Sequence, residues 1–274
     1  MNPSRERVFN IPPAVLLTAA ALVAVHAVFE LLPYYVRAEV LLLFAFSPDR
    51  YHGSWLGFAP WYIGWGAAVW TFVTYAFLHG SLAHLMFNLV WLLAFGTPVA
   101  RRFGPFRFAI FFLFAAIAGA VFHLAVHFNE GEPVIGASAA ISGMMGAAIR
   151  FVFQRGGPLA RLYQTSQVAA LRGDEPGTYQ IPALPLRENL RDPRVLVFLL
   201  MWFGFNFLCG KFSTELLGMG QNIAWEAHIG GFLAGFLGFG LFDPVSAPPE
   251  QFERPEQHDQ ATDETELVSQ NDQS

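Results

Sequence analysis

The sequence predicts an all-α membrane protein, a bundle of six transmembrane helices whose first outer loop lies at the membrane interface. Of its 274 residues, 54% are hydrophobic and only 14% are charged. The apolar residues gather in six segments, each close to the roughly 20 residues that a helix needs to cross a bilayer. These segments are 14–35, 72–97, 105–128, 134–153, 195–212 and 223–242. So many long apolar segments exclude a single soluble domain.

The basic residues predict how the segments are oriented. One side carries Arg5, Arg7, Arg101, Arg102, Arg107, Arg150, Arg155, Arg161, Arg172, Arg187, Arg191 and Arg194, and the other carries Arg37, Arg50 and Lys211. The positive-inside rule therefore places both termini in the cytoplasm. The first segment has no small-residue cleavage site, so we interpret it as a retained anchor. We expect an integral protein of a bacterial inner (plasma) membrane, with no nucleic-acid partner.

The connections and ends differ in character from the segments. Residues 1–10 form a short cytoplasmic N-terminus, and residues 11–242 form the membrane domain. Residues 38–71 are rich in Trp and Tyr but broken by Gly and Pro, which predicts a loop in the outer interface. Residues 154–192 are too polar to insert and predict a mobile cytoplasmic connector. The acidic tail, 243–274, lacks apolar periodicity and should be disordered; the single Cys209 excludes an internal disulfide.

A few polar side chains lie inside the apolar segments, where they are costly and usually functional. His84 and Asn88 are four residues apart and share a face of the second segment. Ser138 lies near the start of the fourth segment, in "PVIGASAAISGMMGAAIRF", and His228 lies near the start of the sixth. Since these three segments run in the same direction, Ser138, His84 and His228 should lie at similar depth. His79 lies nearer the outer end.

Stripes of small residues predict that the fourth and sixth segments pack closely. Gly231, Gly235 and Gly238 follow His228 at helical spacing, and Ala139, Gly143 and Gly146 follow Ser138. Small residues let membrane helices approach each other. The serine and the imidazole could then meet, although such stripes also occur where helices only pack.

Other polar residues have simpler interpretations. We interpret Ser142 as a helix-packing residue, His26, His123 and His127 as structural or interfacial, and Glu30 and Glu226 as lying near the outer headgroups. His79, His84 and His228 could in principle bind a metal. However, the chain has no HExxH motif, no Cys companion and no Asp within a segment. We therefore expect no metal and no cofactor. Since no Asp is available for an aspartyl mechanism or a Ser–His–Asp triad, a Ser–His pair is the remaining candidate for a catalytic group.

At this point the chain resembles the rhomboid intramembrane serine proteases over roughly residues 68–242. Members carry a GxSG motif that opens the fourth helix, a His in AHxGG on the sixth, and H-x(4)-H-x(3)-N on the second. The corresponding stretches here are "GASA" with Ser138, "AHIGG" with His228, and "HGSLAHLMFN" with His79, His84 and Asn88. The sequence departs from the family pattern at Ala139, at Thr71 after Trp70, and at Ser142. These departures concern rate and substrate preference more than chemistry.

The resemblance implies a six-helix fold and a serine endopeptidase that cleaves transmembrane helices near the outer membrane boundary. Ser138 would be the nucleophile and His228 its base. His84, Asn88 and the Ser138 backbone N–H would stabilise the oxyanion. Gly136 and Ala139 would support the site, and His79 would line its entrance. We expect no strain at Ala139, because "ASAAISGMMGAAI" is typical of a helix from Ser138 onward. A rhomboid-like pseudoprotease that binds membrane helices without cleaving them is the alternative.

Overall fold

A computed structural model describes residues 11–51, 62–128, 132–159, 176–216 and 223–245. Within these ranges the chain is helical, and its β pairing is one isolated antiparallel bridge between Phe46 and Val134. The predicted all-α class is therefore confirmed for the described residues. The predictions for residues 1–10 and for most of the acidic tail, 246–274, lie outside them.

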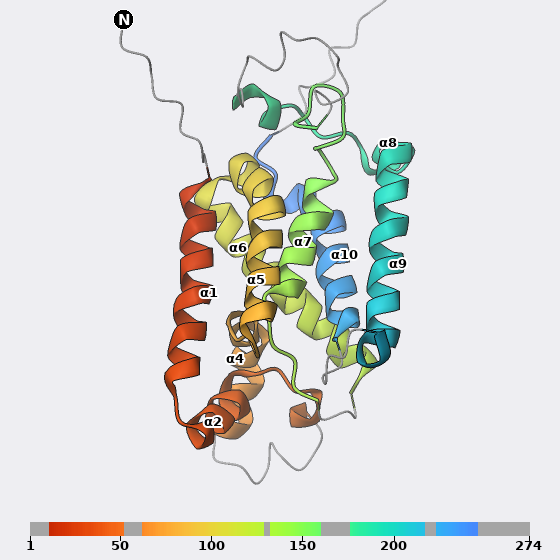
Figure 1. Ribbon diagram of the computed structural model, residues 1–274. Coiled ribbons are helices and arrows are strands. Elements are labelled where there is room, and N and C mark those ends of the chain that lie inside the picture. The colour runs from red at the N-terminus through yellow and green to blue at the C-terminus, as the bar shows by residue number, and fades with distance from the viewer. Residues whose placement is uncertain (1–10, 52–61, 129–131, 160–175, 217–222, 246–274) are drawn as a thin grey trace, which may run out of the picture.

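The main helices form an elongated bundle in which α7 occupies the centre (Figure 1). Helix α1 lies at one side of this view and α9 at the other, while α10 lies beside α7. The bounds are α1 Pro13–Leu31, α5 Leu82–Trp91, α6 Thr97–Val126, α7 Ser138–Ala148, α9 Pro193–Leu216 and α10 Trp225–Phe242. The shorter elements are α2 Tyr34–Phe44, η1 Pro48–Tyr51, η2 Tyr62–Gly66, α4 Ala67–Thr74, η3 Tyr75–Phe77, η4 Leu92–Gly96, η6 Pro176–Tyr179 and α8 Leu186–Asn189.

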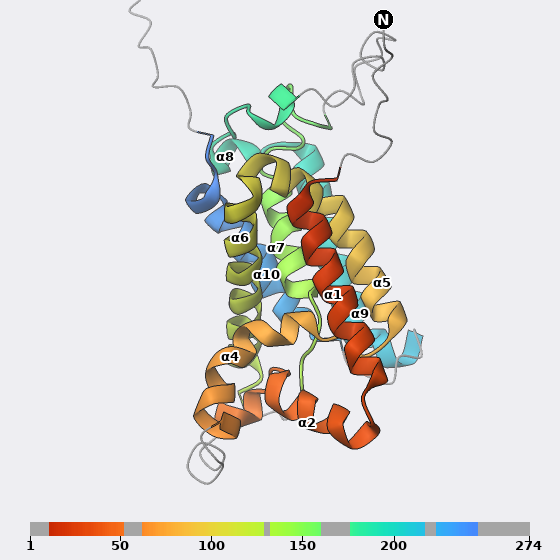
Figure 2. The same cartoon turned by 90° about the vertical axis from the view of Figure 1, so that its left-hand side faces the viewer.

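Three helical stretches of the described chain are long and apolar enough to cross a membrane. They are Pro13–Leu31, Leu82–Val126 and Pro193–Lys211, with mean hydropathies of 2.1, 2.4 and 1.5. The second has 45 residues and is interrupted at Gly104, whose φ of 76° and ψ of 170° are not helical. Pro105 follows and cannot donate a backbone hydrogen bond. The chain turns there within α6, so the part of α6 after Gly104 runs in the direction opposite to α5 (Figure 2).

The second predicted segment begins later than the sequence suggested. Apolar composition placed its start at residue 72, but α4 and η3 end at Phe77 and α5 begins only at Leu82. Ser81 causes this break, because its hydroxyl accepts a hydrogen bond of 3.2 Å from the backbone N–H of His84 and caps the new helix. His79 therefore lies in the connection before α5, and His84 lies in the first turn.

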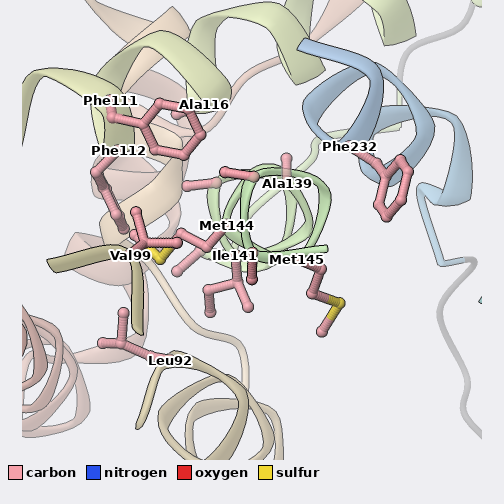
Figure 3. Close-up of a cluster of buried hydrophobic side chains, with 14 of the residues drawn as sticks. Leu92, Val99, Phe111, Phe112, Ala116, Ala139, Ile141, Met144, Met145 and Phe232 are labelled. Atoms are coloured by element: carbon pink, nitrogen blue, oxygen red, sulfur yellow. The ribbon is translucent and has the colours of Figure 1, made fainter. Parts of the chain in front are cut away.

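The core surrounds α7. Every residue of this helix from Ala139 to Ala148 is buried. Figure 3 shows Ile141, Met144 and Met145 projecting from α7 among side chains of neighbouring helices, including Leu92, Val99, Phe111, Phe112 and Phe232. Because α7 is enclosed on all sides, the position of Ser138 at its first turn is fixed by close packing rather than by a surface loop.

The end of the bundle opposite α2 is held together by a buried ion pair. The Arg102 guanidinium donates two hydrogen bonds of 2.8 Å to the Asp243 carboxylate, and also donates to the carbonyls of Tyr179 and Ile181. Gln154 hydrogen-bonds Leu184 and other backbone groups of the same connection. The sequence predicted a mobile connector over 154–192. Its described parts, 154–159 and 176–192, are instead held to the bundle, because buried polar side chains find their partners there.

Candidate active site

Ser138 and His228 meet between α7 and α10. The Ser138 Oγ lies 2.8 Å from the His228 Nε2, at hydrogen-bonding distance, although the residues are 90 positions apart. Ser138 is the first residue of α7 and His228 lies in the first turn of α10. Both side chains are half-buried. A hydroxyl hydrogen-bonded to an imidazole nitrogen is the arrangement in which a histidine can remove the proton of a serine.

Small residues bring these two helices together. A Cβ atom built on Gly231 would lie 2.0 Å from the backbone oxygen of Ala139, and one on Gly235 would lie 1.9 Å from that of Gly143. The predicted close packing of the two helices is therefore confirmed at Gly231 and Gly235. Gly238 does not share this contact with α7, because a Cβ added there would meet the ring of Phe114 on α6.

The imidazole of His228 has a second partner that the sequence analysis missed. Its Nδ1 lies 2.8 Å from the Asn206 Oδ1 on α9. The Asn206 Nδ2 donates to the Trp202 carbonyl at 2.9 Å, one turn earlier in α9, which turns the amide oxygen toward His228. An acceptor at Nδ1 places the ring proton on that nitrogen and leaves Nε2 as a base for Ser138. The available signal was an Asn in the apolar run "FGFNFL".

Gly136 places the α5 side chains beside the segment that leads to Ser138. Its φ of +117° is a conformation that favours glycine. A Cβ there would lie 2.6 Å from the His84 Nε2 and 3.8 Å from the Asn88 Nδ2. The Gly136 N–H donates to the Tyr75 carbonyl at 2.9 Å, and the Asn88 amide donates to the His84 carbonyl at 3.0 Å. His84 and Asn88 therefore share a face directed toward the backbone just before Ser138.

The remaining predicted residues lie around this centre. His79 is buried, with its ring 5.0 Å from that of His84 and its carbonyl 3.2 Å from the His26 Nδ1. Ser142 is buried within α7. Ala139 lies in the first turn of α7, and no described residue other than glycine has a positive φ. The prediction that Ala139 occupies unstrained helix is thus confirmed.

The fold and this arrangement define a class: a helical integral membrane protein with a Ser–His pair held between two of its helices. Comparison with known families gives a match to the rhomboid domain over residues 66–172. This match, together with rhomboid proteases among the similar proteins, supports a rhomboid family protein. The matched region contains Ser138 but ends before Asn206 and His228, so the contacts of these two residues come from the structure.

Similar proteins include both active and inactive members of this family. Rhomboid protease GlpG of Pectobacterium atrosepticum is 27% identical over 74% of this chain and 58% of its own length. Rhomboid protease GluP of Bacillus subtilis is 27% identical over 61% of this chain and 25% of its own. Inactive RHOMBOID-like protein 8 of Arabidopsis thaliana is 36% identical over 30% of this chain and 22% of its own. The chain thus spans less than two thirds of each of these relatives.

Proposed function

We propose that this protein is an intramembrane serine endopeptidase that cleaves transmembrane helices near the outer boundary of the membrane. The observation that carries the proposal is the hydrogen bond of 2.8 Å between the Ser138 Oγ and the His228 Nε2. Ser138 would be the nucleophile and His228 the general base. Packing on both helices holds the pair, as a preorganised site requires.

The reaction would proceed in two halves. The Ser138 Oγ attacks the carbonyl carbon of the scissile peptide while His228 Nε2 takes the hydroxyl proton. The C–N bond then breaks, His228 returns that proton to the leaving amine, and an acyl-enzyme remains. Water attacks the ester carbonyl, gives a proton to His228, and releases the new carboxyl group as the proton returns to Ser138. Asn206 would act as a positioning residue, because it holds Nδ1–H and keeps Nε2 available in both halves.

The oxyanion of each half would form beside Gly136. Three donors lie around this segment: the Ser138 backbone N–H, the Asn88 side-chain amide and the His84 ring. The Asn88 amide donates one N–H to the His84 carbonyl and has a second N–H left for the oxyanion. Donors that are fixed before the reaction can contribute a few kcal/mol each. Ala139 leaves its own N–H unchanged and keeps the first turn of α7 regular. Gly136 leaves the space that a side chain would fill.

Water and substrate would reach the site from the end of the bundle that carries α2. A cavity of about 650 Å³ opens there, lined by His26, Glu30, Arg37, Gly80, Ser81 and Leu82. Gly80, one of its lining residues, directly follows the buried His79 in the chain. Substrates would be single-span or other transmembrane proteins whose helix unwinds locally to present an extended segment. Six crossings with both termini in the cytoplasm, in a bacterial inner membrane, complete the topology that we propose.

A pseudoprotease that binds membrane helices without cleavage is the second candidate, and the similarity to an inactive RHOMBOID-like protein favours it. A serine-reactive fluorophosphonate in detergent discriminates between the two. We expect labelling of the wild type and of Ser142→Ala, a matched serine variant on the same helix, but not of Ser138→Ala. Cleavage of a single-span model substrate should follow the same pattern. A wild type that is neither labelled nor active but retains the uncut substrate would establish the binder.

A further inference from the structure

A second cluster of ligating side chains lies where the end of α6 meets the start of α10. One of its members, Glu226, lies two residues before His228 in the sequence. His123 and His127 are one helical turn apart at the end of α6, with their rings 4.6 Å from each other at an angle of 29°. Glu226, in the first turn of α10, places its Oε1 3.0 Å from the His127 Nε2 and its Oε2 4.0 Å from the His123 Nδ1. From the sequence, His123 and His127 were expected to be structural or interfacial, and Glu226 to lie near the outer headgroups.

We propose that His123, His127 and Glu226 form a binding site for a divalent transition metal, with zinc as the preferred ion. One ligand atom from each residue lies within 4.8 Å of the others. Two ligands on a tetrahedral zinc ion with bonds of about 2.0–2.1 Å are about 3.3 Å apart. Side-chain rotations that move atoms by about 1.5 Å or less therefore close the site around an ion. This proposal departs from the expectation that the chain binds no metal.

The chemistry of the three groups favours a cation over a simple ion pair. The side chains of His123 and Glu226 are only 9% and 11% exposed, and a buried carboxylate requires a positive partner. One carboxylate can neutralise one imidazolium, whereas two stacked imidazolium rings would repel each other. A divalent cation attracts the carboxylate and both neutral imidazoles together. Two imidazole nitrogens and one carboxylate oxygen suit zinc rather than calcium or magnesium, which prefer oxygen ligands.

The site also has a rigid frame and an access route. A Cβ built on Gly230 would lie 2.3 Å from the Phe122 Cβ and 2.9 Å from the Ala118 carbonyl oxygen, so α6 and α10 are in close contact beside the cluster. The His127 side chain is 20% exposed and gives an ion a path from solvent. Three protein ligands leave the fourth position of a tetrahedral ion for water. A bound ion would therefore join the end of α6 to the turn that carries His228.

The test is a zinc titration of the full chain, purified in detergent with a histidine-free tag and stripped with EDTA. ZnCl₂ in competition with a chromophoric chelator gives the Kd, and elemental analysis gives the stoichiometry. We expect one equivalent, and a Tm that rises by about 5 °C or more at one hundred times the Kd. His123→Gln, His127→Gln and Glu226→Gln should each weaken binding by at least about tenfold. His26→Gln, the same change at a buried histidine of α1, should not.

Two outcomes would overturn the proposal. One is a wild type that binds no zinc at 100 µM, which is roughly the weakest affinity of interest; this outcome needs no variant to fold. The other is binding that persists in the three cluster variants but disappears in His84→Gln or His228→Gln, because zinc would then occupy the catalytic histidines. Elution volume and helical circular dichroism identify any variant that has failed to fold. Zinc binding by Ser138→Ala should equal that of the wild type, which separates this site from the proposed protease chemistry.

Discussion

Adding one methyl group at Gly231 tests whether close contact between α7 and α10 sets the geometry of the proposed catalytic dyad, Ser138 and His228. In Gly231→Ala the new Cβ would lie 2.0 Å from the Ala139 carbonyl oxygen, and real Cβ contacts are essentially never closer than 3.0 Å. The contact is with backbone, so no side chain can rotate away. The two helices must therefore part by about 1 Å beside Ser138 and His228.

The expected loss follows from that displacement. A separation of about 1 Å would stretch the 2.8 Å contact between the Ser138 Oγ and the His228 Nε2 beyond the range of a hydrogen bond. Misplacing a reacting group by 1 Å can cost about 10²-fold in rate. Overpacking of a well-filled interior costs about 1–3 kcal/mol of stability. We therefore expect turnover to fall about a hundredfold, in kcat more than in KM, while the protein remains folded.

The assay is cleavage of a fluorescent single-span substrate in proteoliposomes, together with thermal unfolding in detergent. Gly240→Ala is the matched control, because it makes the same change on α10 where no atom lies within 4 Å of the new Cβ. It should remain within about twofold of the wild type, and Ala should even favour the helix there. If folded Gly231→Ala kept at least half of the wild-type kcat, the dyad would not depend on this contact and the reasoning would be wrong.

Three further changes probe the site and its support. Asn206→Ala should lower kcat about tenfold to a hundredfold with little change in KM. Asn206→Asp should recover much of the lost kcat, since a carboxylate also accepts a hydrogen bond from the His228 Nδ1–H. Equal losses in both variants would indicate that Asn206 has a structural role only. Gly136→Ala should lower turnover more than tenfold in the same cleavage assay, because alanine at a φ of +117° costs about 1–3 kcal/mol and its Cβ would collide with His84; wild-type turnover would contradict this. Arg102→Ala should destabilise the protein by about 3–5 kcal/mol, measured by unfolding in micelles, because Asp243 would remain buried without its partner; a loss below about 1 kcal/mol would show that the pair contributes little.

The meeting of Ser138 and His228 could be predicted from the sequence because topology restricts depth. Segments that cross the membrane in the same direction place residues near their starts at the same level. The spacing of Gly231 and Gly235 after His228 then marked the face of α10 that admits another backbone. The shared direction of crossing and the glycine spacing thus indicated that Ser138 and His228 could meet, but the same features also fit helices that only pack, and the contact itself comes from the structure.

The Asn206 contact could not be predicted in the same way. Helix α9 is apolar on all sides, with Leu200, Met201 and Phe205 exposed, so its sequence does not indicate which face turns inward. The start of α5 was misplaced for a related reason. Hydropathy does not distinguish a helix from the turn that interrupts it, and the Ser81 cap had to be given more weight than the apolar run around it. The rotation of a helix about its axis and the position of its cap depend on single polar atoms. Hydropathy averaged over a whole segment does not show these atoms.

Ala139 shows how a departure from a family pattern can be accommodated elsewhere in the chain. Its backbone needs no glycine, because the first turn of α7 is regular. Its methyl group does need space, and α6 provides that space at Gly119, where an added Cβ would lie 2.6 Å from the Ala139 Cβ. The methyl group of Ala139 therefore occupies the space between α6 and α7 that Gly119 leaves open by having no side chain. The residue after the proposed nucleophile is constrained less by the chemistry of the site than by the helix that packs against it.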